Sequence, residues 1–402
     1  MNILLAGQAY YRRDNGQAVF TINLAEGLAA TGHDVTVLAP SDSGTASLTT
    51  THGVQVQTVP ALALIDNTNI TAFSGSLVEE TISANKPDVV HIQDHYFLSH
   101  TVLSAAKNRG ILAVGTNHFL PENLTDNLPF SQWLHKPLDY LLWSAMLAVY
   151  NQLSAVSTPT ETAAAILRSQ RIHVPVTAIS CGVELERFHP RPTLDRLEIR
   201  QKYKIAADKL IFLYVGRIDR EKDLDVLLRG WSQVTGGNIQ LVLAGKGGFR
   251  PELEKMVEEY GLGDSVIFAG FVPDEDLPFL LNSADIFAMP SHAELQSIAT
   301  LEAMASGLPI LAADARALPE LVKPGINGYL FSAGNAFDVA RKIRTLISHP
   351  EQWPAMSHAN QQKASLHAHN KIVEQYTEWY KQAALGTLLH PAWSGIFQAV
   401  DV

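Results

Sequence analysis

The sequence predicts an α/β protein with two domains, each built on a parallel, doubly wound sheet. Short apolar runs alternate with helical patterns along the chain, which is typical of βαβ units. The same alternation starts again after a proline-rich stretch without periodicity, Phe188–Pro192, which we interpret as a linker. A length of 402 residues suffices for two or three domains with complete cores.

Composition excludes several classes of protein. The chain is 47% hydrophobic and 17% charged with a formal net charge of −10, whereas nucleic-acid-binding proteins carry a basic surface. A single cysteine, Cys181, excludes a disulfide framework and a cysteine zinc site, and it fits a reducing cytoplasm. Met1–Gly7 lacks the basic region of a signal peptide, and no apolar run approaches the roughly 20 residues that span a bilayer. We therefore expect a cytoplasmic protein.

The first half predicts a β-loop-α-β unit followed by further strands. A helix is expected at Phe20–Ala30, where Gly32 ends it, and Thr160 is expected to cap a later helix. The predicted strands are Ile3–Ala6, Asp34–Ala39, Asp88–Ile92, Leu112–Gly115, Ser154–Thr158 and Val176–Ser180. Gly16 lies in the loop before the first helix, where a glycine lets the backbone approach a phosphate, although a plain turn explains it equally well.

Histidines and an aspartate gather at the ends of two of these strands. They are His91, Asp94, His95 and His118. Strand ends are where ligands bind in open α/β sheets, so a metal cluster is conceivable there. The spacing matches no common set of metal ligands, and we expect hydrogen-bonded polar residues and no metal.

The second half repeats the pattern, with strands expected at Leu210–Val215, Gln240–Leu243, Val266–Phe268 and Ile286–Met289 and a helix from about Leu224. Three segments that follow these strands contain residues that could bind a ligand or a metal ion. Gly216–Lys222 contains two cations, and a solvated charged loop is an equally good interpretation of it by itself. Ala244–Gly248 lacks the full Gly-x-Gly-x-x-Gly pattern, so we do not expect nicotinamide binding. Asp223–Asp225 spells Asp-x-Asp, but acids are favoured at a helix start, and we expect no metal site.

The strongest functional signal is Ser291–Pro309. A helix is expected to begin at Ser297 and to end near Gly307, so the backbone N–H groups of Leu295, Gln296, Ser297 and Ile298 would lie at its N-terminus. Such an end binds anions, because its donors are unpaired and the helix dipole is positive there. Glu294 and Glu302 flank this end. Taken singly, each is explained as an acid that stabilises a helix N-terminus by less than about 1 kcal/mol.

Together these residues resemble a known family. Glu294, seven residues, Glu302 and then Ala-Met-Ala-Ser-Gly-Leu-Pro resemble the signature of retaining, nucleotide-sugar-dependent glycosyltransferases. That family includes sucrose-phosphate synthases, phosphatidylinositol mannosyltransferases and bacterial glycolipid glucosyltransferases. The loop with Arg217 and Lys222 resembles the family's Gly-Arg…Lys-Gly motif, with Asp223 in place of the last glycine. Two other motifs also depart from the family pattern: Asn-Gly replaces Gly-Gly at 15–16, and Cys-Gly-Val-Glu replaces Asn-Gly-Val-Asp at 181–184.

The resemblance implies the GT-B fold, two Rossmann-like domains facing a cleft. Residues 1–187 would bind the acceptor and residues 188–375 the nucleotide sugar, while 376–402 would pack back on the first domain. The implied reaction transfers a hexose, preferably glucose from UDP-glucose, to a hydroxyl group with retention of configuration. A UDP-sugar is expected in preference to a GDP-sugar, and neither a metal nor another cofactor is expected.

The resemblance also implies a role for each site residue. Glu294 would bind hydroxyls of the donor sugar and Glu302 the ribose, while His118 would hold the sugar and help to orient the acceptor. The remaining roles belong to phosphate and base: Arg217, Lys222 and the amides of Leu295–Ile298 would stabilise the departing diphosphate, Gly16 would approach a phosphate, and the backbone near Val272 would meet the nucleobase.

The acceptor is suggested by an apolar stretch after His118. The stretch, expected to be an irregular loop, contains Phe119, Leu120, Leu124, Leu128, Phe130, Trp133 and Leu134. Such a loop is costly to leave in water, so it predicts a lipid acceptor such as diacylglycerol and weak contact with the inner membrane face. Leu138–Tyr150 is apolar all round and is expected to be a buried core helix.

Three alternatives stay open at this stage. Without a basic cluster to attract anionic lipid, a soluble sugar or polyol acceptor is a close alternative. A nucleotide-sugar 2-epimerase shares the expected fold and needs no acceptor. A non-enzymatic sensor would also bind a nucleotide sugar, but the presence of both glutamates, Arg217, Lys222 and His118 argues against it.

Overall fold

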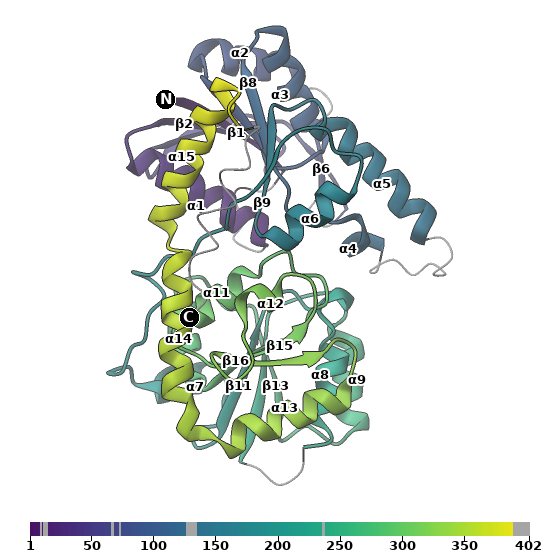
Figure 1. Cartoon of the computed structure of the whole chain (residues 1–402), viewed down its shortest axis with the longest axis vertical. Coiled ribbons are helices and arrows are strands. Elements are labelled where there is room, and N and C mark those ends of the chain that lie inside the picture. Colours follow the sequence, from purple (N-terminus) through teal and green to yellow (C-terminus); the bar gives the residue numbers. More distant parts are fainter. Residues whose placement is uncertain are drawn as a thin grey trace. The chain divides into compact units, whose positions relative to one another are not determined.

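The computed structural model describes residues 1–8, 10, 15–65, 68–71, 74–125, 135–234 and 238–388 (Figure 1). Its contacts divide the chain into two compact units. Unit 1 comprises Met1–His118, Tyr140–Ile179 and the described chain from Ile372 onward, and unit 2 comprises Phe119–Asp139 and Ser180–Lys371. The predicted domains changed at 187/188 and 375/376, whereas the units change at 179/180 and 371/372 and unit 2 also takes up residues 119–139.

Unit 1 is built on an eight-stranded sheet in the order β10-β9-β8-β7-β1-β2-β4-β3. Every described pair in it is parallel except β3 with β4. The strands are β1 (Asn2–Ala6), β2 (Asp34–Pro40), β3 (Ser47–Thr51), β4 (Val54–Val59), β7 (Val89–Ile92), β8 (Leu112–Thr116), β9 (Ala155–Thr158) and β10 (Val176–Ala178), and a separate hairpin pairs β5 (Leu62–Ile65) with β6 (Thr68–Ile70). From β1 the chain builds outward in both directions, so the switch point of the sheet lies between β1 and β7.

The helices of unit 1 are α1 (Gly16–Ala30), α2 (Gly75–Asn85), α3 (Phe97–Asn108), most of α5 (His135–Tyr150), α6 (Glu161–Ser169) and most of α15 (His369–Leu385). The start of α1 was predicted one turn too late. Asn15 caps it, because its side-chain oxygen accepts a hydrogen bond from Ala18 N at 2.9 Å. Thr160 caps α6 in the same way, as predicted.

Helix α15 packs against the sheet of unit 1 through polar contacts in a buried setting (Figure 1). The Tyr380 hydroxyl lies 2.8 Å from His91 Nδ1, and Tyr376 lies 3.1 Å from the Ser157 hydroxyl. The other His91 nitrogen lies 2.7 Å from Thr116 Oγ1. Burial, together with the neighbouring His118, lowers the pKa of His91 to about 3, so the ring is neutral. His91 therefore joins α15 to the sheet, as expected for a hydrogen-bonded histidine.

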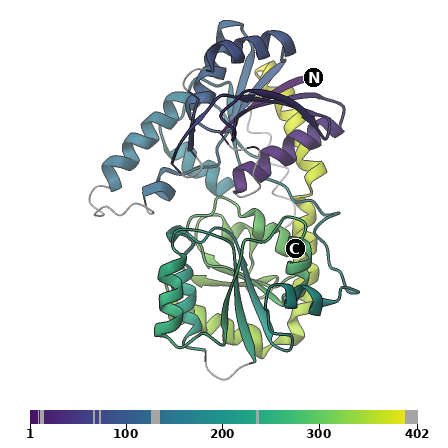
Figure 2. The same cartoon turned by 180° about the vertical axis from the view of Figure 1, so that it is seen from behind.

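Unit 2 is built on a six-stranded parallel sheet in the order β13-β12-β11-β14-β15-β16, with helices on both faces (Figure 2). The strands are β11 (Leu210–Val215), β12 (Ile239–Ala244), β13 (Val266–Gly270), β14 (Ile286–Met289), β15 (Ile310–Asp314) and β16 (Gly328–Ser332). Two of them, β11 and β14, match their predicted bounds at both ends. The order reverses between β11 and β14, which makes this the switch point of unit 2. The predicted class, two doubly wound α/β domains, is confirmed.

The helices of unit 2 are α4 (Pro121–Thr125), α7 (Arg196–Lys202), α8 (Leu224–Trp231), α9 (Arg250–Glu259), α10 (Leu277–Ser283), α11 (Ile298–Ala305), α12 (Leu318–Leu321), α13 (Ala336–Ser348) and α14 (Trp353–Leu366), with 3₁₀ turns η2 (Arg220–Lys222) and η3 (Pro350–Gln352). Helix α8 packs against both α13 and α9, α11 packs against α14, and α7 packs against α10. In the core, Trp231 meets Phe212 edge to face at 5.3 Å between ring centroids. This frame holds the loops that follow β11 and β14.

Two predictions about the apolar stretch after His118 need correction. Part of the expected irregular loop is helix α4, and Leu120 in front of it is buried. The expected core helix, α5, buries residues of its second half, but Tyr140 and Leu141 are 67% and 63% exposed. Leu128, Phe130, Trp133 and Leu134 lie outside the described residues. Among the residues that the structure describes, no helix is long and apolar enough to cross a membrane.

Candidate active site

The loops after β11 and β14 meet at the switch point of unit 2 and bring together three of the predicted site residues. Lys222 Nζ donates a hydrogen bond to Glu294 Oε1 at 2.7 Å, and the two side chains are only 15% and 13% exposed. Arg217, on the same loop as Lys222, is 47% exposed and forms ion pairs with Asp219 and Glu221. Two cations and a carboxylate that accepts hydrogen bonds therefore occupy the position where ligands bind in doubly wound sheets.

Glu221 is a site residue that the sequence did not reveal. It is 1% exposed, it pairs with Arg217, and its carboxylate lies 3.9 Å from Lys222 Nζ. It lies in the 3₁₀ turn η2. The available signal was its position, since it stands directly before one cation and in the same loop as the other. Glu221 thus links both cations in a row of alternating charges that ends at Glu294.

Glu294 is ionised. Burial acts to raise its pKa, but the charge and hydrogen bond of Lys222 outweigh this, with help from Ser291 and Arg217, and the pKa is lowered. An ionised carboxylate only accepts hydrogen bonds. Glu294 is therefore suited to bind hydroxyl groups, as the family resemblance implied.

The residues before α11 hold a strained turn. Ser297 caps the helix, since its hydroxyl accepts from Thr300 N at 3.2 Å. Its backbone has φ 76° and ψ 90°, a conformation that residues other than glycine rarely adopt. Strain of this kind persists where the surroundings impose it and is frequent at ligand-binding sites. The backbone amides from Leu295 to Ile298 are thereby held in one fixed arrangement at the helix N-terminus.

The side chain of Gln296 joins this turn to another segment of unit 2 through hydrogen bonds. Its Oε1 accepts from Cys181 N at 2.7 Å and from the Ser180 hydroxyl at 3.1 Å. The side chain of Gln296 is thus committed to these contacts, and the predicted contact of its backbone amide with a ligand stays a prediction. Burial raises the pKa of the Cys181 thiol to about 12, so it is an inert buried group.

Glu302 and Val272 are placed less directly. Glu302 lies in α11, is 9% exposed and interacts electrostatically with Arg187. Val272 follows β13, which β12 separates from β11 in the sheet, and it packs against the core of the unit. Their predicted contacts with ribose and nucleobase stay predictions.

In unit 1 the predicted residues lie near the ends of β1 and β8. Gly16 is the first residue of α1, and His118 follows β8. His118 Nε2 lies 3.3 Å from Gln93 Oε1, and its ring packs on Phe20 with 4.6 Å between centroids. Burial lowers the pKa of His118 to about 3, so this histidine is neutral and acts through hydrogen bonds. The predicted residues thus form two sets, one on each unit.

Comparison with known families decides the identity of the chain. Residues 14–187 match the model described as Glycosyltransferase Family 4, and residues 195–363 match the model described as Glycosyl transferases group 1. The chain belongs to the GT-B glycosyltransferases. The group 1 match contains Arg217, Lys222, Glu294 and Glu302, and the family 4 match contains Gly16 and His118.

Individual relatives of this glycosyltransferase act on different substrates. The sulfoquinovosyl transferase SQD2 of Arabidopsis thaliana is 29% identical over 69% of the chain, and the match spans 52% of that protein's length. The alpha-monoglucosyldiacylglycerol synthase of Streptococcus pneumoniae is 25% identical over 87% of the chain and 79% of its own length. The crystal structure of Anabaena Alr3699/HepE, in complex with UDP and glucose, superimposes with a TM-score of 0.77 at 20% identity, covering 95% of the chain and 99% of that structure.

The structure explains how the glycosyltransferase accommodates Asp223 where its family has glycine. Asp223 adopts a left-handed backbone conformation with φ 48°, which asparagine and aspartate tolerate better than most residues. Its carboxylate lies 2.7 Å from His292 Nδ1. Asp225, the other acid of the Asp-x-Asp sequence, pairs with Arg229 at 2.7 Å. Among the described residues no group of three potential ligands could hold a metal ion.

The glycine-rich loop after β12 supports the loop of Arg217. A Cβ atom on Gly245 would lie 1.8 Å from the carbonyl oxygen of Gly216, so the two backbones can approach only without side chains. Ile218 N also donates to the Lys246 carbonyl at 2.8 Å. These glycines allow the two loops to pack closely. This packing accounts for a glycine-rich loop that resembles the dinucleotide-binding pattern but lacks the full Gly-x-Gly-x-x-Gly sequence.

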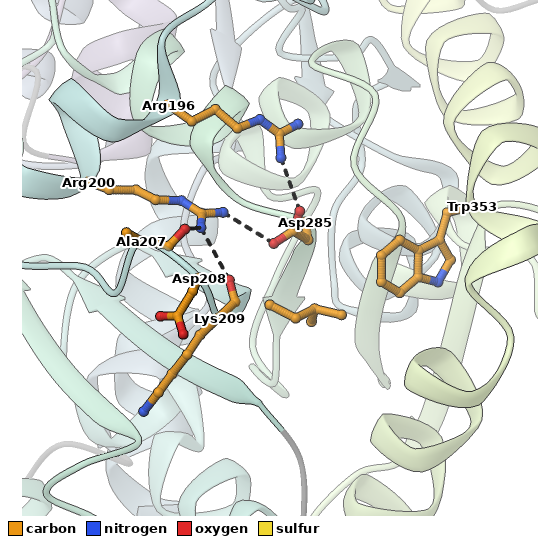
Figure 3. Close-up of a pocket in the computed structure, with 8 residues that line it drawn as sticks. Arg196, Arg200, Ala207, Asp208, Lys209, Asp285 and Trp353 are labelled. Atoms are coloured by element: carbon orange, nitrogen blue, oxygen red, sulfur yellow. Dashed lines mark hydrogen bonds and ion pairs between the residues drawn. The ribbon is translucent and has the colours of Figure 1, made fainter.

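A pocket of about 320 Å³ lies elsewhere in unit 2, at the amino ends of β11 and β14 (Figure 3). It is lined by Arg196, Arg200, Ala207, Asp208, Lys209, Leu210, Asp285 and Trp353. Arg200 is 6% exposed and donates to the carbonyls of Ser283, Ala206, Ala207 and Lys209 and to Asp285. The pocket is at the opposite edge of the sheet from Glu294, and its buried arginine is committed to the fold.

Proposed function

We propose that this glycosyltransferase moves a hexose, preferably glucose from UDP-glucose, to a hydroxyl acceptor with retention of the anomeric configuration and without a metal ion. The observation that carries the proposal is the Lys222–Glu294 pair at the switch point of unit 2, with Arg217 and the helix α11 N-terminus in the same unit. It combines cations and the backbone amides of a helix N-terminus for a diphosphate with a carboxylate for sugar hydroxyls.

The chemistry follows from where charge develops. As the bond from the anomeric carbon to the diphosphate breaks, negative charge accumulates on the leaving group, and preorganised cations and amides stabilise it. In this proposal Lys222 exchanges Glu294 for a phosphate oxygen, and Glu294 then accepts hydrogen bonds from the donor sugar. Glu302 binds the ribose, the backbone near Val272 meets the base, and Gly16 approaches a phosphate. Two fixed cations and a helix end supply the positive charge that a metal would otherwise provide.

The preference for a UDP-sugar is supported by the likeness to the Anabaena structure, which contains UDP and glucose. Its identity of 20% supports the fold alone, so the base and the sugar are part of the proposal.

Two acceptors are candidates, and the first is a hydroxyl of a diacylglycerol-type lipid, reached by weak peripheral contact with the inner face of the membrane. The relative from Streptococcus pneumoniae is named as a glucosyldiacylglycerol synthase, and Tyr140 and Leu141 on α5 expose apolar side chains. A soluble sugar or polyol is a second candidate, because the net charge of −10 does not favour anionic lipid surfaces. Co-sedimentation with vesicles, compared with a Tyr140→Ser/Leu141→Ser double variant, separates the two candidates.

The proposed reaction is tested with UDP-glucose, with and without acceptor, in the presence and absence of EDTA. We expect glucosyl transfer that EDTA leaves unchanged, and a proton NMR coupling of the product that shows the α configuration of the donor. Restoration of an EDTA-sensitive activity by magnesium or manganese would refute the metal-free mechanism. Conversion of the sugar without an acceptor would identify a 2-epimerase, and the absence of any turnover would favour a sensor.

A further inference from the structure

Unit 1 has a switch point of its own, between β1 and β7, and two glutamines follow these strands. Gln8 comes after β1, and Gln93 comes directly after β7. Loops that diverge at such a point form the usual binding place in doubly wound sheets. Neither side chain is among the predicted site residues of unit 1, which are His118 and Gly16.

Gln93 is buried with half of its amide group unpaired. Its side chain is 1% exposed, its Oε1 lies 3.3 Å from His118 Nε2, and its Nε2 has no hydrogen-bond partner. Gly7 makes room for it, because a Cβ atom there would lie 2.8 Å from Gln93 Cβ. Buried amide donors are nearly always paired in proteins, so an unpaired one calls for a water or a ligand.

Gln8 repeats this situation on the neighbouring strand end. Its backbone N–H donates to Asp94 Oδ2 at 2.6 Å, whereas both polar atoms of its side chain are buried without a partner. Asp94 does not supply the missing bonds, since its other oxygen already accepts from the Ser99 hydroxyl at 2.7 Å and from Tyr96 N at 3.0 Å. A carboxamide with both polar atoms unpaired and one with an unpaired nitrogen therefore follow adjacent strands at the switch point.

The state of His118 fits the same interpretation. Because its ring is neutral, one nitrogen carries hydrogen and the other accepts. A carboxamide oxygen only accepts, so the assigned contact with Gln93 Oε1 places the hydrogen on Nε2 and leaves Nδ1 with a lone pair. His118 and the two glutamines thus offer neutral donors and acceptors, which is the complement of hydroxyl groups.

We propose that Gln93 and Gln8 bind the hydroxyls of a neutral, polyhydroxylated acceptor, and that Gln93 determines acceptor specificity. The inference rests on the proposed transfer function. It favours a sugar or polyol group over an acceptor with a single hydroxyl, because one hydroxyl would leave most of these polar atoms unpaired. Sites built around buried polar groups discriminate strongly against substrates that cannot pair with them.

The test replaces Gln93 by methionine, which keeps the length of the side chain and removes its polar atoms. Gln55→Met, at an exposed position on β4, is the matched control. The probes are glycerol, glucose and myo-inositol as acceptors for UDP-glucose, together with hydrolysis of UDP-glucose without acceptor. For Gln93→Met we expect the acceptor KM of at least one probe to rise by about tenfold or more, a larger factor than any change in the donor KM or in the hydrolysis rate. Gln55→Met should behave as wild type.

Other results overturn the proposal in distinguishable ways. An equal fall in hydrolysis and transfer means that Gln93 merely positions His118, and unchanged kinetics mean that water alone pairs its amide. Hydrolysis without transfer to any probe leaves the donor function intact and refutes the polyol acceptor. Saturation-transfer NMR with myo-inositol gives a readout independent of turnover. We expect a signal with the wild-type protein and loss of that signal with Gln93→Met. If the wild-type protein gives neither a signal nor transfer to any probe, the inference is refuted.

Discussion

At the scale of single residues, the Lys222–Glu294 pair keeps two opposite charges in place with little exposure to water. The charge and hydrogen bond of Lys222 outweigh the burial of Glu294, so the pKa of this carboxyl group is lowered. The buried carboxylate of Glu221 pairs in turn with the half-exposed Arg217. A ligand with both phosphate and hydroxyl groups can replace these contacts one for one.

Glu294→Gln tests this arrangement. The amide keeps the shape of the side chain but loses the charge and one acceptor, so we expect kcat to fall by about 100-fold or more while circular dichroism shows a folded protein. Glu254→Gln, at a surface pair with Arg250 on α9, should leave kcat unchanged. A Glu294→Gln enzyme with more than half of the wild-type turnover would contradict the assignment.

The residues that sequence could identify share one property. Arg217, Lys222 and Glu294 carry charge in loops that follow predicted strands, and their match to the motifs of the glycosyltransferase family, more than their spacing, singled them out. Glu221 and Gln93 were missed because their significance is burial, which depends on chain segments far away. Gln93 lies against Gly7, and no local sequence pattern predicts that contact.

At the scale of elements, the eight-residue helix α11 depends on its first turn. Ser297 contributes a cap and at the same time occupies a backbone conformation that suits glycine. The cap stabilises the helix, while the positive φ opposes it. The two effects can be separated by substitution.

Ser297→Ala loses the cap and keeps the strain, so we expect a destabilisation of about 1 kcal/mol. Ser297→Gly loses the cap but relieves the strain, and it should cost only a few tenths of a kcal/mol. Urea unfolding, followed by a probe in unit 2, measures both. An alanine variant as stable as the glycine variant would show that Ser297 is not strained.

Strands were easier to predict than helix limits. Both faces of β11 and β14 are buried, and the resulting continuous apolar runs show their bounds directly. Helix α1 begins a turn before its apolar pattern because Asn15 caps it. Helix α5 is apolar on all sides, which favoured complete burial, yet Tyr140 and Leu141 face water. Apolar character shows that a residue can be buried, but whether it is buried depends on the elements that pack against it.

At the scale of the whole molecule, the cations and the helix end of the proposed diphosphate site belong to one unit, while unit 1 adds the backbone of Gly16. Arg217, Lys222 and the α11 N-terminus all lie in unit 2, which has its own core. UDP without a sugar should therefore stabilise unit 2 more than unit 1.

Calorimetry with UDP tests this expectation. A ligand at 100 times its Kd stabilises the protein that binds it by about 2.7 kcal/mol, which should raise the transition of unit 2 more than that of unit 1. Lys222→Ala should reduce the shift, whereas Lys255→Ala, at an exposed position on α9, should preserve it. An equal shift of both transitions, or no shift with wild type, would contradict the placement of the site.

The packing of α15 also has a consequence for the order in which the protein matures on the ribosome. The residues from Ile372 to Leu385 complete unit 1, yet they are translated after every residue of unit 2. Until then His91 lacks its tyrosine partner, and the apolar face that Tyr376 and Trp379 cover is open to water. The unit that begins first in translation is therefore finished last, and the nascent chain must keep its sheet soluble while the second unit folds.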